Sequence, residues 1–514
     1  MASNAASPPT DSAALIAELQ AENERLRGML TTLKRMLFGA RSEKHEVDRA
    51  QLALGLADVT IAPIEAEPGA GGDALTRTTT PRPKALRNIG ALPNHLPREE
   101  VVIEPAVNVC PCCAGHLHRI GEDVSEMLDI VPAIVRVKRI IRPRYGCRAC
   151  ESAVVQASAP ARPIDGGLPT AALLAHVAVS KFAWHLPLHR QTQMLAGQGL
   201  KLDRSTLVHW VGRTAWWLEP LYKLLLSNVM SATKLFCDDT SLPVLDRSRR
   251  RTRSARLWCY AVDDRPWQGI RPPALVYLYA EDRRGEHLRQ HLQGFSGVLQ
   301  VDAYTGYKAL TRADRSGGAI ALAYCWAHAR RGFYDVHKRT DDPIAADAMR
   351  RIGEFYAIEA RIRGHSAEDR LAVRQAEAAP LLEVFRSWLM ARLEAISAKS
   401  PLADAIRYTL NHWEGLTRFV ADGRIEIDNN TAERGVRPIP LGRKNALFAG
   451  NDAGGHRWAI LASLINTAKL HGLDPQTYLA DVLERVVSGA TKANALAELL
   501  PWAWKAAREQ QAAA

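Results

Sequence analysis

The N-terminal part of the chain carries a heptad pattern of apolar residues. Seven positions follow an alternating three- and four-residue spacing, and only one of them is polar: Ile16, Leu19, Asn23, Leu26, Leu30, Leu33 and Leu37. This pattern predicts a leucine-zipper coiled coil over residues 12–45, and an asparagine at an a position favours a parallel dimer. An amphipathic helix that packs on its own chain would show the same spacing. Residues 55–98 lose this periodicity and are rich in proline and glycine, which predicts a flexible linker.

Helical spacing returns between residues 165 and 228, which we interpret as a helical domain. Two segments, Leu188–Leu195 and Ser205–Val211, are separated by glycines, and Ser205 is a candidate N-cap of the second segment. This arrangement is typical of a helix-turn-helix that reads DNA. A purely structural pair of helices has the same pattern, so both interpretations stay open.

The chain then changes to short runs of strand-forming residues, interrupted by one helical pattern at Glu286–Leu292. The runs lie at Lys234–Cys237, Leu257–Val262, Ala274–Tyr279 and Val298–Val301. Strands and a helix in this order predict an α/β or α+β core. Strand-like residues return only once more, at Arg424–Ile427.

Between these strand-forming regions, residues 341–420 have a helical pattern and few strand formers. We interpret them as a helical insertion that divides the core into residues 230–340 and 421–470. The remaining residues, 471–514, are mostly helical in pattern and rich in alanine. The fold class that follows is a multidomain α/β protein.

Composition narrows the class of protein further. The 514 residues exceed what one hydrophobic core usually organises. No apolar run approaches the roughly 18 residues that span a bilayer, so we expect no membrane partner. Lysine and arginine number 67 against 55 acidic residues, and the net charge of +12 favours a polyanionic partner such as DNA. The first ten residues do not resemble a secretory signal, so we expect a cytoplasmic, nucleoid-associated protein.

The cysteines indicate a metal site in residues 100–155. Two Cys-x-x-Cys pairs, Cys110 with Cys113 and Cys147 with Cys150, can direct four thiolates at one structural Zn²⁺. Three nearby side chains offer alternative ligands: Cys112, His116 and His118. Between the pairs, residues 134–144 alternate apolar with basic side chains. This alternation predicts a ribbon with a cationic face that either contacts phosphates or is simply solvated.

Acidic residues follow the apolar runs at several points. Asp238 ends the first run, Asp302 ends the fourth, and Glu433 lies on a short predicted helix whose face it shares with Asn429. Carboxylate oxygens are the ligands that Mg²⁺ prefers, and a pair of such ions can catalyse phosphodiester chemistry. Each acid taken alone is weak support, because aspartate at a strand end is often only a turn former.

Several motifs in order along the chain resemble the transposases of the insertion sequence 66 (IS66) family. They are Asp238-Asp239-Thr240, Gln300-Val301-Asp302-Ala303-Tyr304-Thr305-Gly306-Tyr307, Cys325-Trp326-Ala327-His328-Ala329-Arg330-Arg331, Asp428-Asn429-Asn430-Thr431-Ala432-Glu433-Arg434, Leu441-Gly442-Arg443-Lys444-Asn445 and Phe448-Ala449-Gly450. The resemblance covers nearly the whole chain, because that family also has an N-terminal zipper and a four-cysteine zinc-binding domain.

The resemblance implies an RNase H-like, mixed-sheet catalytic core of the DDE type, with an all-helical insertion between its second and third acids. Asp238, Asp302 and Glu433 would bind Mg²⁺ or Mn²⁺. The family usually has Asp-Glu-Thr-Pro at the first acid, whereas this chain has a second aspartate there, so Asp239 remains an alternative to Asp238. Two further acids, Glu426 and Asp428, are weaker candidates for the third position.

The resemblance also implies the partners and the surrounding residues. His328 is expected either to support the acids or to contact DNA, Asn429 is expected to support the acids, and Cys325 is interpreted as a core residue. An ordinary buried role for both Cys325 and His328 stays open. We assign DNA contacts to eight basic residues: Arg249, Arg250, Arg251, Arg330, Arg434, Arg437, Arg443 and Lys444. The first three belong to a basic run over residues 247–256, which either clamps the DNA backbone from a hairpin tip or is a solvated loop. The expected partners are transposon-end and target DNA, a second copy of the chain paired through the zipper or a higher oligomer, and companion proteins of the same element.

The function predicted from the sequence is therefore that of a DNA transposase which cleaves transposon ends and joins them to a target. Two alternatives stay open at this point. One is a catalytically inactive, zinc-containing DNA-binding protein derived from a transposase. The other is an RNase H-like nuclease or resolvase without strand transfer.

Overall fold

A computed structural model of the chain describes residues 135, 137–142, 144–146, 154–156, 158–246 and 251–513. The predicted zipper and linker lie outside the described residues, as do Cys110, Cys113, Cys147 and Cys150. A short antiparallel pair, β1 (Arg144–Gly146) with β2 (Val154–Gln156), comes before the helices and the main sheet in sequence. None of the helices in the described ranges has the length and apolar character needed to cross a membrane.

Three helices open the main unit: α3 (Ala171–Phe182), α4 (Leu188–Gly197) and α5 (Arg204–Met230). The predicted second helix is therefore much longer than Ser205–Val211, because buried apolar side chains continue at helical spacing to Val229. The expected N-cap at Ser205 is wrong, since the helix begins one residue earlier and Asp203 holds the N-cap position.

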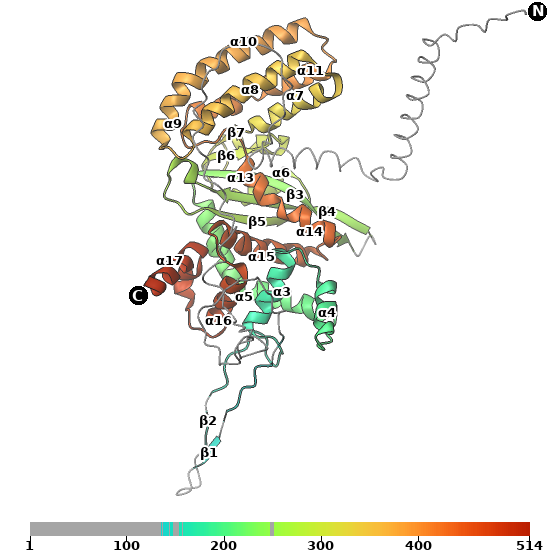
Figure 1. The fold of residues 1–514 in the computed structure, drawn as a ribbon, viewed down its shortest axis with the longest axis vertical. Helices are drawn as coiled ribbons and strands as arrows, with labels where there is room; N and C mark the ends of the chain where they lie inside the picture. Colours follow the sequence, from blue (N-terminus) through green and yellow to red (C-terminus); the bar gives the residue numbers. More distant parts are fainter. Residues whose placement is uncertain are drawn as a thin grey trace, which may run out of the picture. The chain divides into compact units, whose positions relative to one another are not determined.

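A five-stranded mixed sheet forms the centre of the fold (Figure 1). Its strands are β3 (Lys234–Asp246), β4 (Arg251–Val262), β5 (Ala274–Ala280), β6 (Gly297–Val301) and β7 (Ile320–Tyr324). The spatial order is β5-β4-β3-β6-β7, with β3, β4 and β5 antiparallel and β3, β6 and β7 parallel. The predicted mixed α/β class is thus confirmed.

The sheet differs from the predicted one at two places. β7 was not predicted from the sequence, and the strand predicted at Arg424–Ile427 is wrong because that segment forms bends and turns. Its backbone does not join the sheet ladder. Instead, the side-chain amide of Gln300 accepts from the Glu426 N–H at 2.9 Å and donates to the Glu426 carbonyl at 2.8 Å.

Short helices connect the parallel strands. α6 (Gly285–His291) links β5 to β6, the 3₁₀ segment η2 (Thr305–Thr311) follows β6, and α7 (Trp326–Thr340) follows β7. A run of helices then extends to the third acid: α8 (Pro343–Ile362), α9 (Ala367–Val373), the π-helical turn η3 (Arg374–Ala378), α10 (Ala379–Ala395), α11 (Pro401–Asn411) and α12 (Trp413–Thr417). These helices bury their own aromatic core, in which Trp326 lies 5.2 Å from Phe355 between ring centroids.

The chain ends in helices that return to the sheet: α13 (Asn430–Val436), α14 (Pro438–Asn445), α15 (Asp452–Leu470), α16 (Pro475–Val487) and α17 (Pro501–Ala513). α15 covers the edge strand β5 and supplies hydroxyl partners for its outer backbone groups. The Tyr277 N–H donates to Ser463 Oγ at 2.8 Å, and Thr467 Oγ1 donates to the Leu275 carbonyl at 2.9 Å. An edge that would otherwise be open to another strand is therefore closed.

The sheet, α3 to α5 and the C-terminal helices share one hydrophobic core. Residues near Ala171 and residues near Tyr478, three hundred positions apart in sequence, belong to the same cluster. The three helices that precede β3 are thus packed as a layer on the five-stranded sheet.

Candidate active site

The pairing of β3 with β6 brings the first two acids together. Phe236 lies opposite Gln300 in this parallel register, so two residues further along Asp238 falls beside Asp302. Asp238 still lies within β3, where β4 pairs with it at Cys259, whereas Asp302 directly follows the end of β6. The carboxyl ends of neighbouring parallel strands meet at one edge, which is where α/β proteins usually form their sites.

The backbone after Asp302 has an unusual conformation. Ala303 has a φ of 62°, in the left-handed region that a residue with a side chain rarely adopts. This turn lets the Tyr304 N–H donate to Asp302 Oδ1 at 3.1 Å. Gly306 is required nearby, because a Cβ there would lie 2.3 Å from the Tyr304 ring. Strained residues of this kind concentrate at functional sites.

The third acid is positioned by side chains that hold the segment before α13. Gln300 donates to the carbonyls of Glu426 and Asp428, and Asn429 Nδ2 donates to the Cys237 carbonyl at 2.9 Å. Asn429 is 1% exposed and sits at the N-cap of α13, so Glu433 follows one turn later. The role expected for Asn429 therefore has a structural basis, since it ties the start of α13 to the residue before Asp238.

α13 lies directly on the sheet because of a glycine. A Cβ at Gly435 would approach Cys259 Sγ to 2.7 Å, and the Tyr277 hydroxyl donates to the Gly435 carbonyl at 2.5 Å. Any larger residue at position 435 would lift α13 away from β4. The distance between Glu433 and the acids of the sheet thus depends on close helix–strand packing.

The three acids bring negative charges close together, and Asp238 itself has no cationic partner among the described residues. Burial raises the pKa of Asp238 well above its usual range, and the charges of Asp302 and Glu433 raise it further. Within the part of the chain that the structure describes, no lysine or arginine forms an ion pair with Asp238. A half-buried group of carboxylates that repel one another has the donor chemistry of a site for a hard divalent cation.

Asp239 differs from its neighbour because its charge is already neutralised. Its Oδ1 lies 2.8 Å from Arg283 Nη2 and its Oδ2 lies 3.1 Å from Arg256 Nη1. Arg283 also approaches Asp302 Oδ2 at 3.8 Å and stacks on the Tyr304 ring at 4.0 Å. The geometry therefore favours Asp238 over Asp239 as the acid available to a cation.

The two weaker candidates for the third acid already accept hydrogen bonds from other residues of the chain. Glu426 Oε1 accepts from Arg370 Nη2 at 2.6 Å, and both carboxylate oxygens of Asp428 accept from Asn430. Burial raises the pKa of Asp428 to about 7. Glu433 has no such partner among the arginines and lysines of the described ranges.

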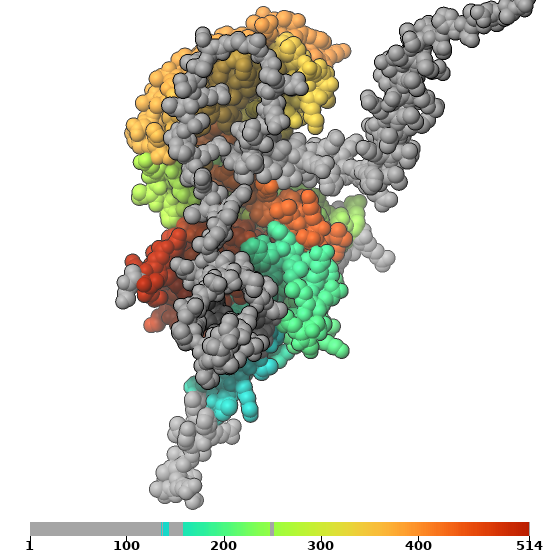
Figure 2. All heavy atoms as spheres, viewed as in Figure 1, coloured from blue at the N-terminus to red at the C-terminus, as the bar shows by residue number. Residues whose placement is uncertain are grey.

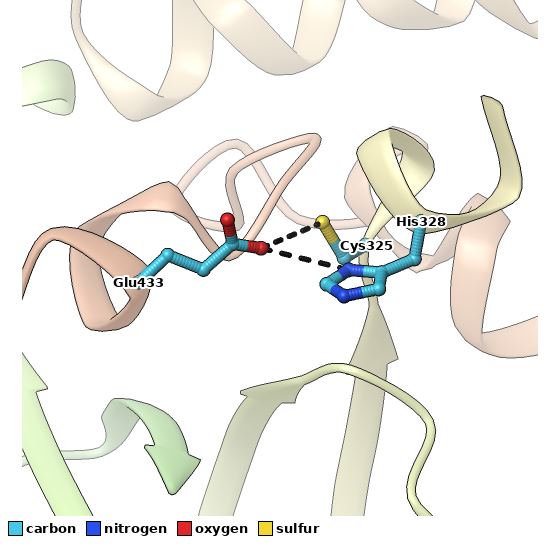
Figure 3. A group of neighbouring side chains, drawn as sticks. All are labelled: Cys325, His328 and Glu433. Atoms are coloured by element: carbon cyan, nitrogen blue, oxygen red, sulfur yellow. Dashed lines mark hydrogen bonds and ion pairs between the residues drawn. The ribbon is translucent and has the colours of Figure 1, made fainter. Parts of the chain in front are cut away.

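The side chains of Cys325 and His328 reach Glu433 from the start of α7 (Figure 3). Cys325 Sγ lies 4.0 Å and His328 Nδ1 lies 3.5 Å from Glu433 Oε1. His328 was expected to support the acids. The contact of Cys325 was missed, because a single cysteine after an apolar run gives no sign of a partner 108 residues away.

The basic residues predicted to contact DNA divide into groups. Arg434, Arg437 and Lys444 are exposed on α13 and α14, and Arg251 is exposed at the start of β4. The orange surface that includes α13 and α14 lies beside the green surface of the first helices of the unit (Figure 2). A Cβ at Gly442 of α14 would lie 3.5 Å from His185 Nδ1, in the connection between α3 and α4.

The remaining basic residues are not simple exposed cations. Arg443 Nη1 donates to the Ser241 carbonyl at 2.6 Å, and Arg330 is half-buried in α7. Arg249 and Arg250 lie outside the described residues. In the rest of the basic run, Arg256 pairs with Asp239 and Arg253 pairs with Asp452, so those two do not project from the hairpin as a clamp on DNA would require.

A mixed sheet that places Asp238 within β3 and Asp302 just after the neighbouring β6 defines an α/β protein with a candidate divalent-metal site. Comparison with known families then gives its relationship: residues 166–457 match the family described as transposase IS66 family. The chain belongs to this family. Three further family matches flank it along the chain: Transposase C of IS166 homeodomain (25–101), zinc-finger binding domain of transposase IS66 (108–151) and IS66 C-terminal element (463–502).

Similar proteins occur in Sinorhizobium fredii. The uncharacterized protein y4jD is 52% identical over 491 residues, which is 95% of this chain and 96% of that protein. The uncharacterized protein y4qI is 40% identical over 96% of this chain and 92% of its own length. The matches support a transposase-type DNA-binding function and a zinc-binding domain over residues 108–151.

Proposed function

We propose that this chain is a DDE transposase that cleaves transposon ends and joins them to target DNA. The observation that carries the proposal is the half-buried group of Asp238, Asp302 and Glu433, in which burial and the charges of the other two acids raise the pKa of Asp238. The mixed five-stranded sheet supports an RNase H-like core, with α8 to α12 as the helical insertion between the second and third acids.

In this proposal the three carboxylates hold a pair of Mg²⁺ or Mn²⁺ ions. Bound there, the ions would activate a water or a 3′-hydroxyl and stabilise the leaving oxygen of the phosphodiester. The residues of the chain set the geometry. β3 and β6 fix Asp238 and Asp302, while Gln300 and Asn429 fix the start of the helix that carries Glu433.

Exposed basic residues would bind the DNA backbone next to these acids. Arg434 and Arg437 lie within one turn of Glu433 along the chain, and Lys444 follows on α14. Phosphate contacts of this kind position the duplex but do not read its sequence. We further propose that the zipper pairs two copies of the chain and that companion proteins of the same element assist them.

Glu433→Gln tests the proposed metal role, because glutamine keeps the size of the side chain and removes its charge. Purified protein is incubated with supercoiled plasmid carrying the transposon ends, in Mg²⁺ or in EDTA. We expect cleavage and strand transfer to fall on the order of a hundredfold or more, with DNA binding nearly unchanged in a mobility-shift assay.

The matched control is Glu484→Gln, which makes the same change on the exposed face of α16. It should leave both activities at the level of the wild type. Strand transfer retained by Glu433→Gln would remove Glu433 from the mechanism. Binding without cleavage by the wild type in Mg²⁺ would instead favour the inactive DNA-binding protein.

A further inference from the structure

Three side chains of different chemistry converge beside the acid cluster. Cys325 Sγ, a ring nitrogen of His328 and a carboxylate oxygen of Glu433 all lie within 4.8 Å of one another (Figure 3). Cys325 and His328 are brought together by the first turn of α7, and Glu433 enters from α13. Thiolate, imidazole and carboxylate are the ligands from which proteins build zinc sites, whereas Mg²⁺ selects oxygen ligands alone.

A second observation indicates that this group is incomplete without a ligand. His328 Nδ1 is buried and forms no hydrogen bond within the described part of the chain, although it faces the Glu433 carboxylate at 3.5 Å. A buried nitrogen without a hydrogen bond costs free energy unless something binds it. Cys325 is 1% exposed, so its sulfur is screened from bulk water and from casual oxidation.

The surroundings also suit a metal-bound thiolate. The Asn429 N–H donates to Cys325 Sγ at 3.3 Å, which would stabilise negative charge on the sulfur. A divalent ion that binds Cys325 would displace the thiol proton to solvent and leave a thiolate ligand.

We propose that Cys325, His328 and Glu433 form a binding site for one thiophilic divalent cation of the Zn²⁺ class, with water completing the coordination. Its ligands are different residues from the four cysteines predicted to bind structural zinc. The site shares one ligand, Glu433, with the proposed catalytic site. Since one carboxylate cannot fully coordinate an ion at each site, the two ions compete for it. Occupancy by Zn²⁺ would therefore inhibit Mg²⁺-dependent DNA cleavage, a consequence that rests on the proposed function.

Cobalt binding tests the site without any DNA. The full-length, reduced protein with zinc retained in its four-cysteine domain is titrated with Co²⁺, and thiolate-to-cobalt charge-transfer absorption is recorded. We expect one additional equivalent in the wild type. Cys325→Ser should lose the charge-transfer band, and His328→Ala should weaken Co²⁺ binding on the order of 10- to 100-fold.

The matched control is Cys259→Ser, which alters another fully buried thiol that lies beside the same helix, at Gly435. It should keep the additional equivalent and its band. Circular dichroism and thermal melting identify any variant that fails to fold, and His328→Ala then decides the question without altering a thiol. Absence of the additional equivalent in the wild type, or an unchanged band in Cys325→Ser, would overturn the site.

Zinc inhibition tests the consequence separately. Cleavage by the wild type in Mg²⁺ should fall at least tenfold as Zn²⁺ is added at concentrations that saturate the cobalt-competent site, and added chelator should reverse the loss. Full cleavage with the site saturated by Zn²⁺ would show that Glu433 is not shared. If cobalt binds as expected but the wild type cleaves no DNA in Mg²⁺ alone, the metal site stands and the proposed function fails.

Discussion

At the level of a single residue, the charge of Asp238 lowers the stability of the fold. Burial and the neighbouring acids raise its pKa in the folded chain above the value in the unfolded chain. The folded state therefore binds more protons than the unfolded state, and stability falls as the pH rises above about 4. A cation bound by the three acids would offset this repulsion, since it binds the folded state alone.

Asp238→Asn separates stability from function on this basis. The amide can still accept from the Asp239 N–H, as Asp238 Oδ1 does at 2.8 Å, but carries no charge. At pH 7 without divalent ions we expect the free energy of unfolding of the variant to exceed that of the wild type by roughly 0.5 to 2 kcal/mol. The variant should therefore unfold at a higher temperature. Added Mg²⁺ should raise the melting temperature of the wild type and leave that of the variant nearly unchanged. Equal Mg²⁺ shifts in differential scanning fluorimetry would contradict binding at Asp238.

At the level of elements, the placement of α13 depends on the helical insertion. Arg370 and Arg374 are buried, and both pair with Glu359 of α8. Arg370 also donates to Glu426, while Arg374 donates to the carbonyls of Phe419 and Asp422. The insertion therefore holds the segment that leads into α13, and a change within it can reach the third acid.

Glu426→Gln tests this coupling. The substitution weakens a charge-assisted hydrogen bond to Arg370, and we expect a loss of about 2 kcal/mol in the free energy of unfolding. DNA cleavage should fall more than DNA binding, because Glu433 loses its fixed position. Glu377→Gln is the control, since it removes a carboxylate that pairs with Arg361 on the surface of the same insertion. Denaturant titration should give the control a loss under about 0.5 kcal/mol, and an equal loss in both variants would contradict the coupling.

The elements predicted from the sequence were those with a strong local pattern. β3 to β6 begin or end close to the predicted bounds because their apolar runs are rich in valine, leucine and tyrosine. β7 was not predicted because its sequence, IALAY, has alanine at every second position and is equally compatible with a helix. The prediction at Arg424–Ile427 was wrong because alternating polar and apolar residues predict a strand. Here the two isoleucines are instead buried in the core of the helical insertion.

The candidate site was predictable in its acids but not in its supporting contacts. Asp238 and Asp302 follow apolar runs, a local signal that a single chain displays. By contrast, the bond from Asn429 to Cys237 spans 192 residues, and the contact of Cys325 with Glu433 spans 108. Such contacts arise from tertiary packing, which no local periodicity records.

At the scale of the whole molecule, the chain carries a net charge of +12, but the basic side chains near the site differ in how far they are available to DNA. Arg253, Arg256 and Arg283 are used in internal ion pairs, whereas Arg434, Arg437 and Lys444 remain exposed. A duplex bound over α13 and α14 would bring its phosphates next to the acid cluster. The electrostatic part of DNA binding should then depend on a few residues rather than on total charge.

The dependence of DNA affinity on salt measures this part directly. Each phosphate neutralised on B-DNA contributes about 0.9 to the slope of log K against log salt. Arg434→Ala combined with Arg437→Ala should therefore reduce the slope by about 1.8, equally for specific and unrelated duplexes. Lys399→Ala combined with Lys492→Ala removes the same charge from exposed positions elsewhere and should leave the slope unchanged. Because both pairs lower the net charge by two, an equal loss of slope in fluorescence anisotropy would mean that overall charge, and not the surface beside Glu433, attracts the DNA.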